Sequence, residues 1–160
     1  MNIRTLAIAS DHRGHEVVDS IKEHLVAAGL QVDIVGRPAN LEQPVDYPDA
    51  AEGVTSAILD GKADVGVLVC GSGIGMSMAA NRVRGIRAAL VGDANAAEMS
   101  RRHNDANVLC MGASCLDVPM MCSILDTWLS TEFEGGRHEA RIRKIDSVGT
   151  CGETAGETAH

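Results

Sequence analysis

The sequence predicts an α/β protein with a three-layer, Rossmann-like fold, in which a five-stranded parallel sheet is flanked by helices on both faces. Short apolar, β-branched runs alternate with longer segments of helical periodicity along most of the chain. Such alternation is typical of a parallel sheet whose two faces are covered by helices. The 160 residues, 45% of them hydrophobic, are enough for one domain with a substantial core.

The predicted elements follow one another in a regular order. The strands are expected at residues 4–10, 31–35, 64–70, 86–92 and 107–112, and the helices that alternate with them at residues 15–28, 48–59, 73–81, 94–103 and 118–130. A Gly-Gly break then precedes a basic helical segment at 137–146, and the remaining 147–160 repeats GETA with almost no apolar content. We therefore expect a single domain over residues 1–146 and a disordered tail over 147–160.

Composition and charge argue against several function classes. Aromatic residues make up 2% of the chain and the net charge is −8, which disfavours nucleic acids and anionic membranes as partners. No apolar run approaches the roughly 18 residues that span a bilayer. The five cysteines lack the paired spacing of a zinc site, and the N-terminal segment lacks the apolar stretch of a signal peptide. These features predict a cytoplasmic protein without a metal.

The segment CGSGIG, residues 70–75, lies between the third strand and the helix that follows it. A turn of this kind points backbone N–H groups at one spot and favours negative charge there. A dinucleotide fingerprint needs glycine where Met76 stands, a phosphatase loop of the Cys-x5-Arg type needs arginine there, and a P-loop needs Gly-Lys-Ser/Thr. An oxyanion cradle beside a catalytic thiol, Cys70, remains. The alternative is a buried structural cysteine.

Other polar residues that could reach this loop are Asp11 and His12 after the first strand, His103 and Asn104 at the end of a helix, and Arg137 and Arg141 four residues apart on one helical face. The two arginines have the spacing to bind one phosphate. Each group also has a structural alternative. The aspartate could cap a helix, the histidine could partner a helix C-terminus, and the arginines could form a solvated face.

Taken in order, the segments SDHRG, VDYPDAA, CGSGIGMSMAANRVRGIRAAL, SRRHNDANVLCMGA and EGGRHEARI resemble the type B ribose-5-phosphate isomerases and their relatives, which include galactose-6-phosphate isomerase subunits. The resemblance covers about residues 3–145. It implies an aldose–ketose isomerase of the pentose phosphate pathway that interconverts D-ribose 5-phosphate and D-ribulose 5-phosphate through ring opening and a cis-enediolate, without a metal or organic cofactor. It also implies a homodimer or a dimer of dimers whose active site lies between two subunits.

The same resemblance implies a role for each matching residue. The catalytic set begins with Cys70 as the base that moves the proton between C2 and C1. His103 is the acid and base that opens the ring, and Asp11 assists it at the substrate hydroxyls. Ser72 supplies a hydroxyl that holds or shuttles a proton. The binding set is Gly71, Gly73, Ile74 and Gly75 for the enediolate, His12, Arg137 and Arg141 for the phosphate, and Tyr47 and Asn104 for the sugar. Some of these, His103 among them, are expected to serve Cys70 of the neighbouring subunit.

One position departs from the family pattern. Ser114 stands where many relatives carry an arginine soon after the fifth strand. The departure leaves open an isomerase of another sugar phosphate, such as a tetrose, allose or galactose 6-phosphate. From a different class, a non-catalytic nucleotide- or phosphate-binding module of similar fold also remains open.

Overall fold

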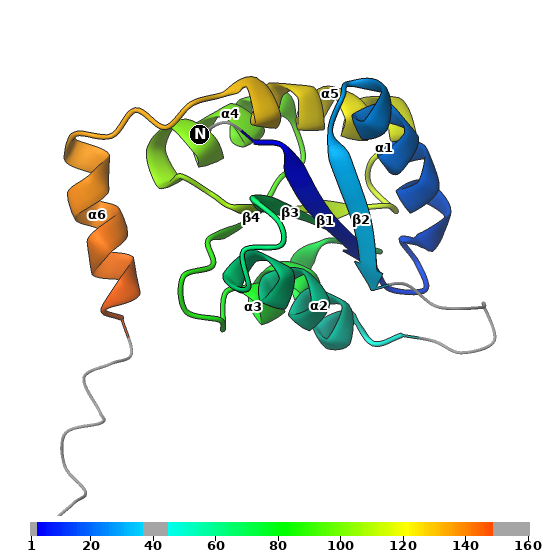
Figure 1. Cartoon of the computed structure of the whole chain (residues 1–160), viewed down its shortest axis with the longest axis horizontal. Coiled ribbons are helices and arrows are strands. Elements are labelled where there is room, and N and C mark those ends of the chain that lie inside the picture. Colours follow the sequence, from blue (N-terminus) through cyan, green and yellow to red (C-terminus); the bar gives the residue numbers. More distant parts are fainter. Residues whose placement is uncertain (1–2, 37–44, 149–160) are drawn as a thin grey trace, which may run out of the picture.

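The computed structural model describes residues 3–36 and 45–148, and over these ranges it confirms the predicted fold class (Figure 1). In the described part of the chain, a five-stranded, all-parallel sheet has the order β2-β1-β3-β5-β4. The strands are β1 (Thr5–Ser10), β2 (Gln31–Gly36), β3 (Val65–Cys70), β4 (Ala88–Leu90) and β5 (Val108–Gly112). All five run in one direction, so their carboxyl ends share one edge of the sheet.

Helices cover both faces of the sheet. They are α1 (His15–Ala27), α2 (Tyr47–Leu59), α3 (Ile74–Ala80), α4 (Ala94–Asn104), α5 (Val118–Ser130) and α6 (Arg137–Asp146). Figure 1 shows α1, α4 and α5 on one side and α2 and α3 on the other. Alternate residues of β1 point to the two faces, so Leu6 and Ile8 join one hydrophobic core cluster and Ala7 and Ala9 join the other.

Two helices begin where the sequence provides a capping side chain. The Asp93 carboxylate accepts the Ala96 N–H at 2.7 Å at the start of α4, and the Asp117 carboxylate accepts the Met120 N–H at 2.9 Å at the start of α5. Each cap satisfies an N–H group that has no partner within its helix.

The strand β4 is shorter than predicted, with three residues instead of the seven expected at 86–92. It lies at the edge of the sheet and pairs with β5 alone. Before the strand begins, the Arg87 N–H donates to the side chain of Asn107 at 2.8 Å. The Arg87 carbonyl still accepts the N–H groups of Asn107 at 3.1 Å and Val108 at 3.3 Å, so the regular pairing is interrupted at the Arg87 N–H alone.

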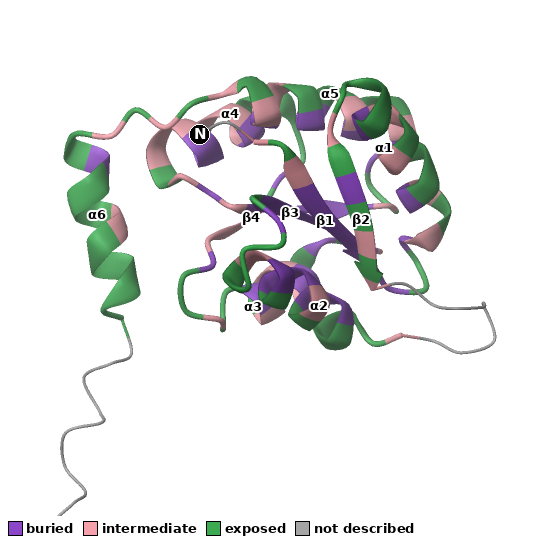
Figure 2. Cartoon of the chain, viewed as in Figure 1, coloured by how far each residue is buried: buried purple, intermediate pink, exposed green. Residues whose placement is uncertain are grey.

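The last helix, α6, stands apart from the body of the protein (Figure 1). Figure 2 shows it largely exposed, and His138 is its buried residue. The tail expected to be disordered, 147–160, lies outside the described residues from position 149 onward. In the ranges that the structure describes, no helix combines the length and apolar character needed to cross a membrane.

Candidate active site

A cavity of about 350 Å³ opens at the carboxyl end of the central strands. Its lining comes from the segments after β1, β3 and β5 and from the start of α2, and comprises Asp11, Arg13, Tyr47, Cys70, Gly71, Ser72, Gly75, Ser114 and Cys115. Ligands of open parallel sheets bind at this edge, because the loops that leave the strands converge there. The cavity is therefore where the fold itself predicts a site.

Cys70 is the last residue of β3, and it faces this cavity although only 5% of the residue is exposed. Its Sγ accepts the N–H of Gly73 at 3.1 Å, just before α3 begins. A fixed N–H donor at a helix start stabilises negative charge on sulfur. Cys110, one strand away, is wholly enclosed, and burial raises its thiol pKa far above the usual value. Cys70 thus combines shelter from water with access to a cavity.

Two glycines keep the loop around Cys70 in its shape. Gly73 has a φ of +75°, and a Cβ at this position would lie 2.5 Å from Leu90 Cδ1 and 3.0 Å from the Met111 carbonyl carbon. At Gly75, a Cβ would lie 2.9 Å from the ring of Tyr47. Glycine at these two positions lets the loop pack closely on β5 and lets the tyrosine ring lie over it.

Asp11 serves a local structural purpose and also faces the cavity. Its Oδ1 accepts the N–H groups of Arg13 at 2.8 Å and Gly14 at 3.1 Å, so it holds the turn that leads into α1. The residue is 6% exposed and lines the cavity. Its second carboxylate oxygen has no hydrogen-bond partner in the described part of the chain. The expected capping role is wrong, because the N-cap of α1 is Gly14 without a side-chain hydrogen bond, and Asp11 holds the turn before the helix instead. This structural role is compatible with a carboxylate that faces the substrate.

The structure brings some of the predicted site residues together and leaves others apart. Asp11, Tyr47, Cys70, Gly71, Ser72 and Gly75 line the cavity. His12, Gly73 and Ile74 adjoin them in sequence without lining it. His103, Asn104, Arg137 and Arg141 lie on α4 and α6 and do not contribute to the cavity of their own chain.

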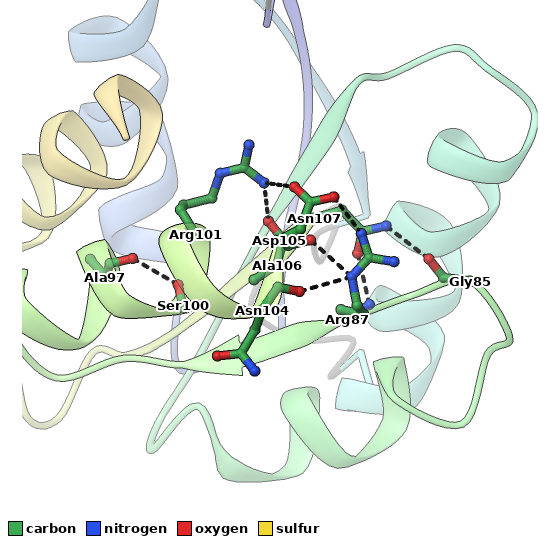
Figure 3. A network of polar contacts seen from close by, with 9 residues as sticks. All are labelled: Gly85, Arg87, Ala97, Ser100, Arg101, Asn104, Asp105, Ala106 and Asn107. Carbon is green, nitrogen blue, oxygen red and sulfur yellow. Dashed lines mark hydrogen bonds and ion pairs between the residues drawn. The ribbon is translucent and has the colours of Figure 1, made fainter. Parts of the chain in front are cut away.

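The end of α4 that carries His103 and Asn104 is held by a buried ionic network (Figure 3). Arg101, 1% exposed, donates to Asp105 Oδ1 at 2.9 Å and to the Ala106 carbonyl at 2.7 Å. Arg87 donates to Asp105 Oδ2 at 2.9 Å and to the Asn104 carbonyl at 3.0 Å. Figure 3 shows the Asn104 amide pointing away from this network. The network thus fixes the backbone and leaves that side chain uncommitted.

His103 lies against His138 of α6, with ring centroids 4.4 Å apart and planes 8° from parallel. Glu134 Oε2 lies 3.8 Å from His103 Nε2 and 3.6 Å from His138 Nε2, and its other oxygen is bound by Arg102. Burial, reinforced by the nearby charges of His103 and Arg137, lowers the pKa of His138. Hydrogen bonds from Arg102 lower the pKa of Glu134.

The ligand atoms of His103, Glu134 and His138 lie within 4.8 Å of one another, which makes them a candidate metal-binding group among the described residues. Their arrangement fits a cation poorly. Nearly parallel rings direct their nitrogen lone pairs along separate planes, and the carboxylate already pairs with Arg102. With Arg137 and Arg141 on the same helix, this region is better suited to binding an anion.

Three residues that were not predicted as site residues also line the cavity: Arg13, Ser114 and Cys115. A signal was present, because each follows the carboxyl end of a central strand. What the sequence could not supply is the direction of the Arg13 side chain, which depends on the packing of the turn after β1 against β3.

Comparison with known proteins gives a consistent result. A family model described as Ribose/Galactose Isomerase matches residues 6–145. The Escherichia coli protein named ribose-5-phosphate isomerase B is 36% identical over 146 residues, covering 91% of this chain and 97% of its own. A Bacillus subtilis relative, 44% identical over 141 residues and covering 88% and 93% of the two chains, has a name that goes no further than sugar phosphate isomerase. The crystal structure of a Thermotoga maritima ribose 5-phosphate isomerase is 46% identical with a TM-score of 0.85, covering 92% of this chain and 100% of that one.

Proposed function

The chain belongs to the ribose/galactose isomerase family and is a sugar phosphate isomerase of that family, and we propose that it interconverts D-ribose 5-phosphate and D-ribulose 5-phosphate. The observation that carries this proposal is the position of Cys70 in the cavity, with the Gly73 N–H directed at its sulfur. A base sheltered from bulk water and adjacent to fixed donors suits proton transfer next to a carbonyl group.

In the proposed reaction, Cys70 acts on the open-chain aldose as a thiolate. It takes the proton from C2, the C2–H electron pair forms the C1–C2 double bond, and the carbonyl electrons move to O1 to give the enediolate. The thiol then returns a proton to C1 while the O2 hydroxyl proton passes to O1 by way of the Ser72 hydroxyl, so O2 becomes the ketone oxygen and no external oxidant or reductant is needed. The thiol proton exchanges with solvent, so the proton delivered to C1 can come from water. Backbone N–H groups of residues 71–75 stabilise the charge on the two adjacent oxygens.

The active site is completed by a second subunit in this proposal. Residues 1–146 form one domain whose helix 137–146 reaches the neighbour, so that the partner subunit's His103, Asn104, Arg137 and Arg141 meet Cys70. Support comes from apolar side chains exposed beside the loop: Ile74 is 47%, Met78 66% and Leu90 45% exposed. Burial of such side chains favours association. The four described cysteines are free, which supports a reducing, cytoplasmic setting.

Substrate preference is tested with aldose phosphates of four, five and six carbons, compared by kcat/KM. We expect the pentose phosphate to have the highest value. A higher value for another chain length would contradict the named substrate but not the reaction class. Cys70→Ala should abolish turnover while sugar phosphate binding persists, whereas a protein that only binds would have no turnover to lose.

Shared active sites are tested by mixing two inactive variants, Cys70→Ala and His103→Ala. A dimer that carries one of each has one site in which both residues are intact, so an equilibrated equal mixture should recover about a quarter of the wild-type activity. The control is each variant alone, re-equilibrated in the same way. A mixture that stays as inactive as its components would show that His103 and Cys70 do not meet across subunits.

A further inference from the structure

Arg13 occupies one side of the cavity, although the roles assigned by family resemblance pass over it. We propose that Arg13 binds the phosphate group of the substrate within its own subunit, in the space beside Ser114, and so helps to select the sugar that fits. This inference rests on the proposed function. It follows from the position of the Arg13 side chain, its lack of a partner and the charge of the cavity.

The Arg13 and Ser114 side chains both approach the backbone of Gly71. A methyl group added to Gly71 would lie 2.9 Å from Arg13 Cδ and 3.7 Å from Ser114 Oγ. Both residues also line the cavity that holds Cys70. The aliphatic stem of Arg13 therefore lies across the first glycine of the loop, with a small neutral hydroxyl beside it. A larger residue at position 114 would compete for this space.

The backbone that carries Arg13 is held firmly. Its N–H donates to Asp11 Oδ1 at 2.8 Å, and the next residue, Gly14, packs so closely on β3 that an added Cβ would lie 2.4 Å from the Val69 carbonyl oxygen. The guanidinium group itself forms no ion pair or hydrogen bond with any residue that the structure describes. A guanidinium group whose N–H donors are unpartnered, carried on a fixed backbone, is well suited to binding an oxyanion.

Charge gives an independent reason for the assignment. Among the described residues that line the cavity, Asp11 is the acidic residue and Arg13 the basic one, and Cys70 adds a negative charge when it acts as the thiolate base. Without Arg13, the lining contributed by one subunit would repel a phosphate group. The Arg13 guanidinium offsets the aspartate and can bind two phosphate oxygens at once, while the Ser114 hydroxyl can donate to a third. The arginines of α6 would then approach the same phosphate from the partner.

The test compares Arg13→Ala with Arg4→Ala, which removes the same charge just before the opposite, amino end of β1. Two quantities are measured: KM for the preferred aldose phosphate and the dissociation constant of inorganic phosphate, the latter by calorimetry. We expect Arg13→Ala to raise both by about 10- to 100-fold, since one charge-assisted pair is lost. Arg4→Ala should leave both within about twofold of wild type.

A second variant tests the position of the phosphate. Because Arg13 and Ser114 face the same space, Arg13→Ala combined with Ser114→Arg should recover most of the lost phosphate affinity. A double variant as weak as Arg13→Ala would show that the phosphate does not lie above Gly71. Equal phosphate affinity in Arg13→Ala and Arg4→Ala would overturn the proposal itself. If the wild type isomerises no sugar phosphate, the proposed function fails, and the calorimetry still decides whether Arg13 binds phosphate.

Discussion

Replacing Gly73 by alanine perturbs the loop at the residue whose N–H is directed at Cys70. Gly73 has a φ of +75°, a conformation that costs a residue with a side chain about 1 to 2 kcal/mol. The new methyl group would also lie 2.5 Å from Leu90 Cδ1 and 3.0 and 3.1 Å from the Met111 carbonyl carbon and oxygen. Leu90 is half exposed and can rotate away, but the Met111 backbone is held inside β5.

The two costs can be separated with a matched control. Gly61 has a φ of +70° with nothing within 4 Å of an added Cβ, so Gly61→Ala isolates the backbone cost of about 1 to 2 kcal/mol. Overpacking against β5 adds about 1 to 3 kcal/mol in Gly73→Ala. Each kcal/mol lowers the Tm of a domain of this size by roughly 2 to 4 °C. Gly73→Ala should therefore melt several degrees below Gly61→Ala.

The assay is urea unfolding followed by circular dichroism, at one protein concentration because association contributes to stability. Activity is measured in parallel. A displaced N–H donor should lower kcat/KM by about 10² in Gly73→Ala, while Gly61→Ala keeps the wild-type value. Equal unfolding free energies for the two variants would refute the packing argument. Wild-type kcat/KM in Gly73→Ala would refute the role of the loop.

Three further predictions follow from other parts of the molecule. Arg101→Ala should lower the unfolding free energy by about 3 kcal/mol, because it leaves the partly buried Asp105 with Arg87 alone. Arg102→Ala, whose ion pairs are open to solvent, should have a clearly smaller effect, and similar losses in urea unfolding would contradict this. Burial lowers the pKa of His138 below its ordinary 6.5, so this group should not affect the docking of α6 above pH 6.5 and should weaken it as the pH falls below that value. Hydrogen exchange in α6 should become faster below pH 6.5 in the wild type but not in His138→Asn. Leu90→Asp should dissociate the proposed dimer and remove activity, whereas the control Val26→Asp on α1 should do neither. An intact Leu90→Asp dimer in sedimentation would count against the interface.

The central sheet was predictable because its strands have a simple chemical pattern. Runs such as residues 65–70 are apolar throughout, as required of strands buried on both faces, and each ends at a turn-forming segment. The edge strand β4 was predicted too long, since the same apolar pattern extends through residues 86–92 where one neighbour is missing. Hydrophobicity identifies what is buried, but it does not show how far a ladder of hydrogen bonds extends.

The candidate site was predictable only in part, because the sequence identifies neighbours along the chain but not side chains that come together through folding or association. The loop at residues 70–75 is local in sequence, and its glycines and cysteine lie together as expected. His103 and the α6 arginines do not line the cavity of their own chain, so their proposed role depends on a second subunit. Arg13 directly follows His12 in the sequence, yet Arg13 is the one that lines the cavity. The turn held by Asp11 places the Arg13 side chain across Gly71.

The most direct test of the account is the transfer of hydrogen at C2 of the sugar. Wild-type protein and Cys70→Ala are incubated with ribose 5-phosphate in D₂O, and deuterium at C2 of the aldose and C1 of the ketose is followed by NMR. The wild type should incorporate deuterium at both carbons. Cys70→Ala should incorporate none while still interconverting the ring anomers. Incorporation by Cys70→Ala at the wild-type rate would show that another group removes the proton.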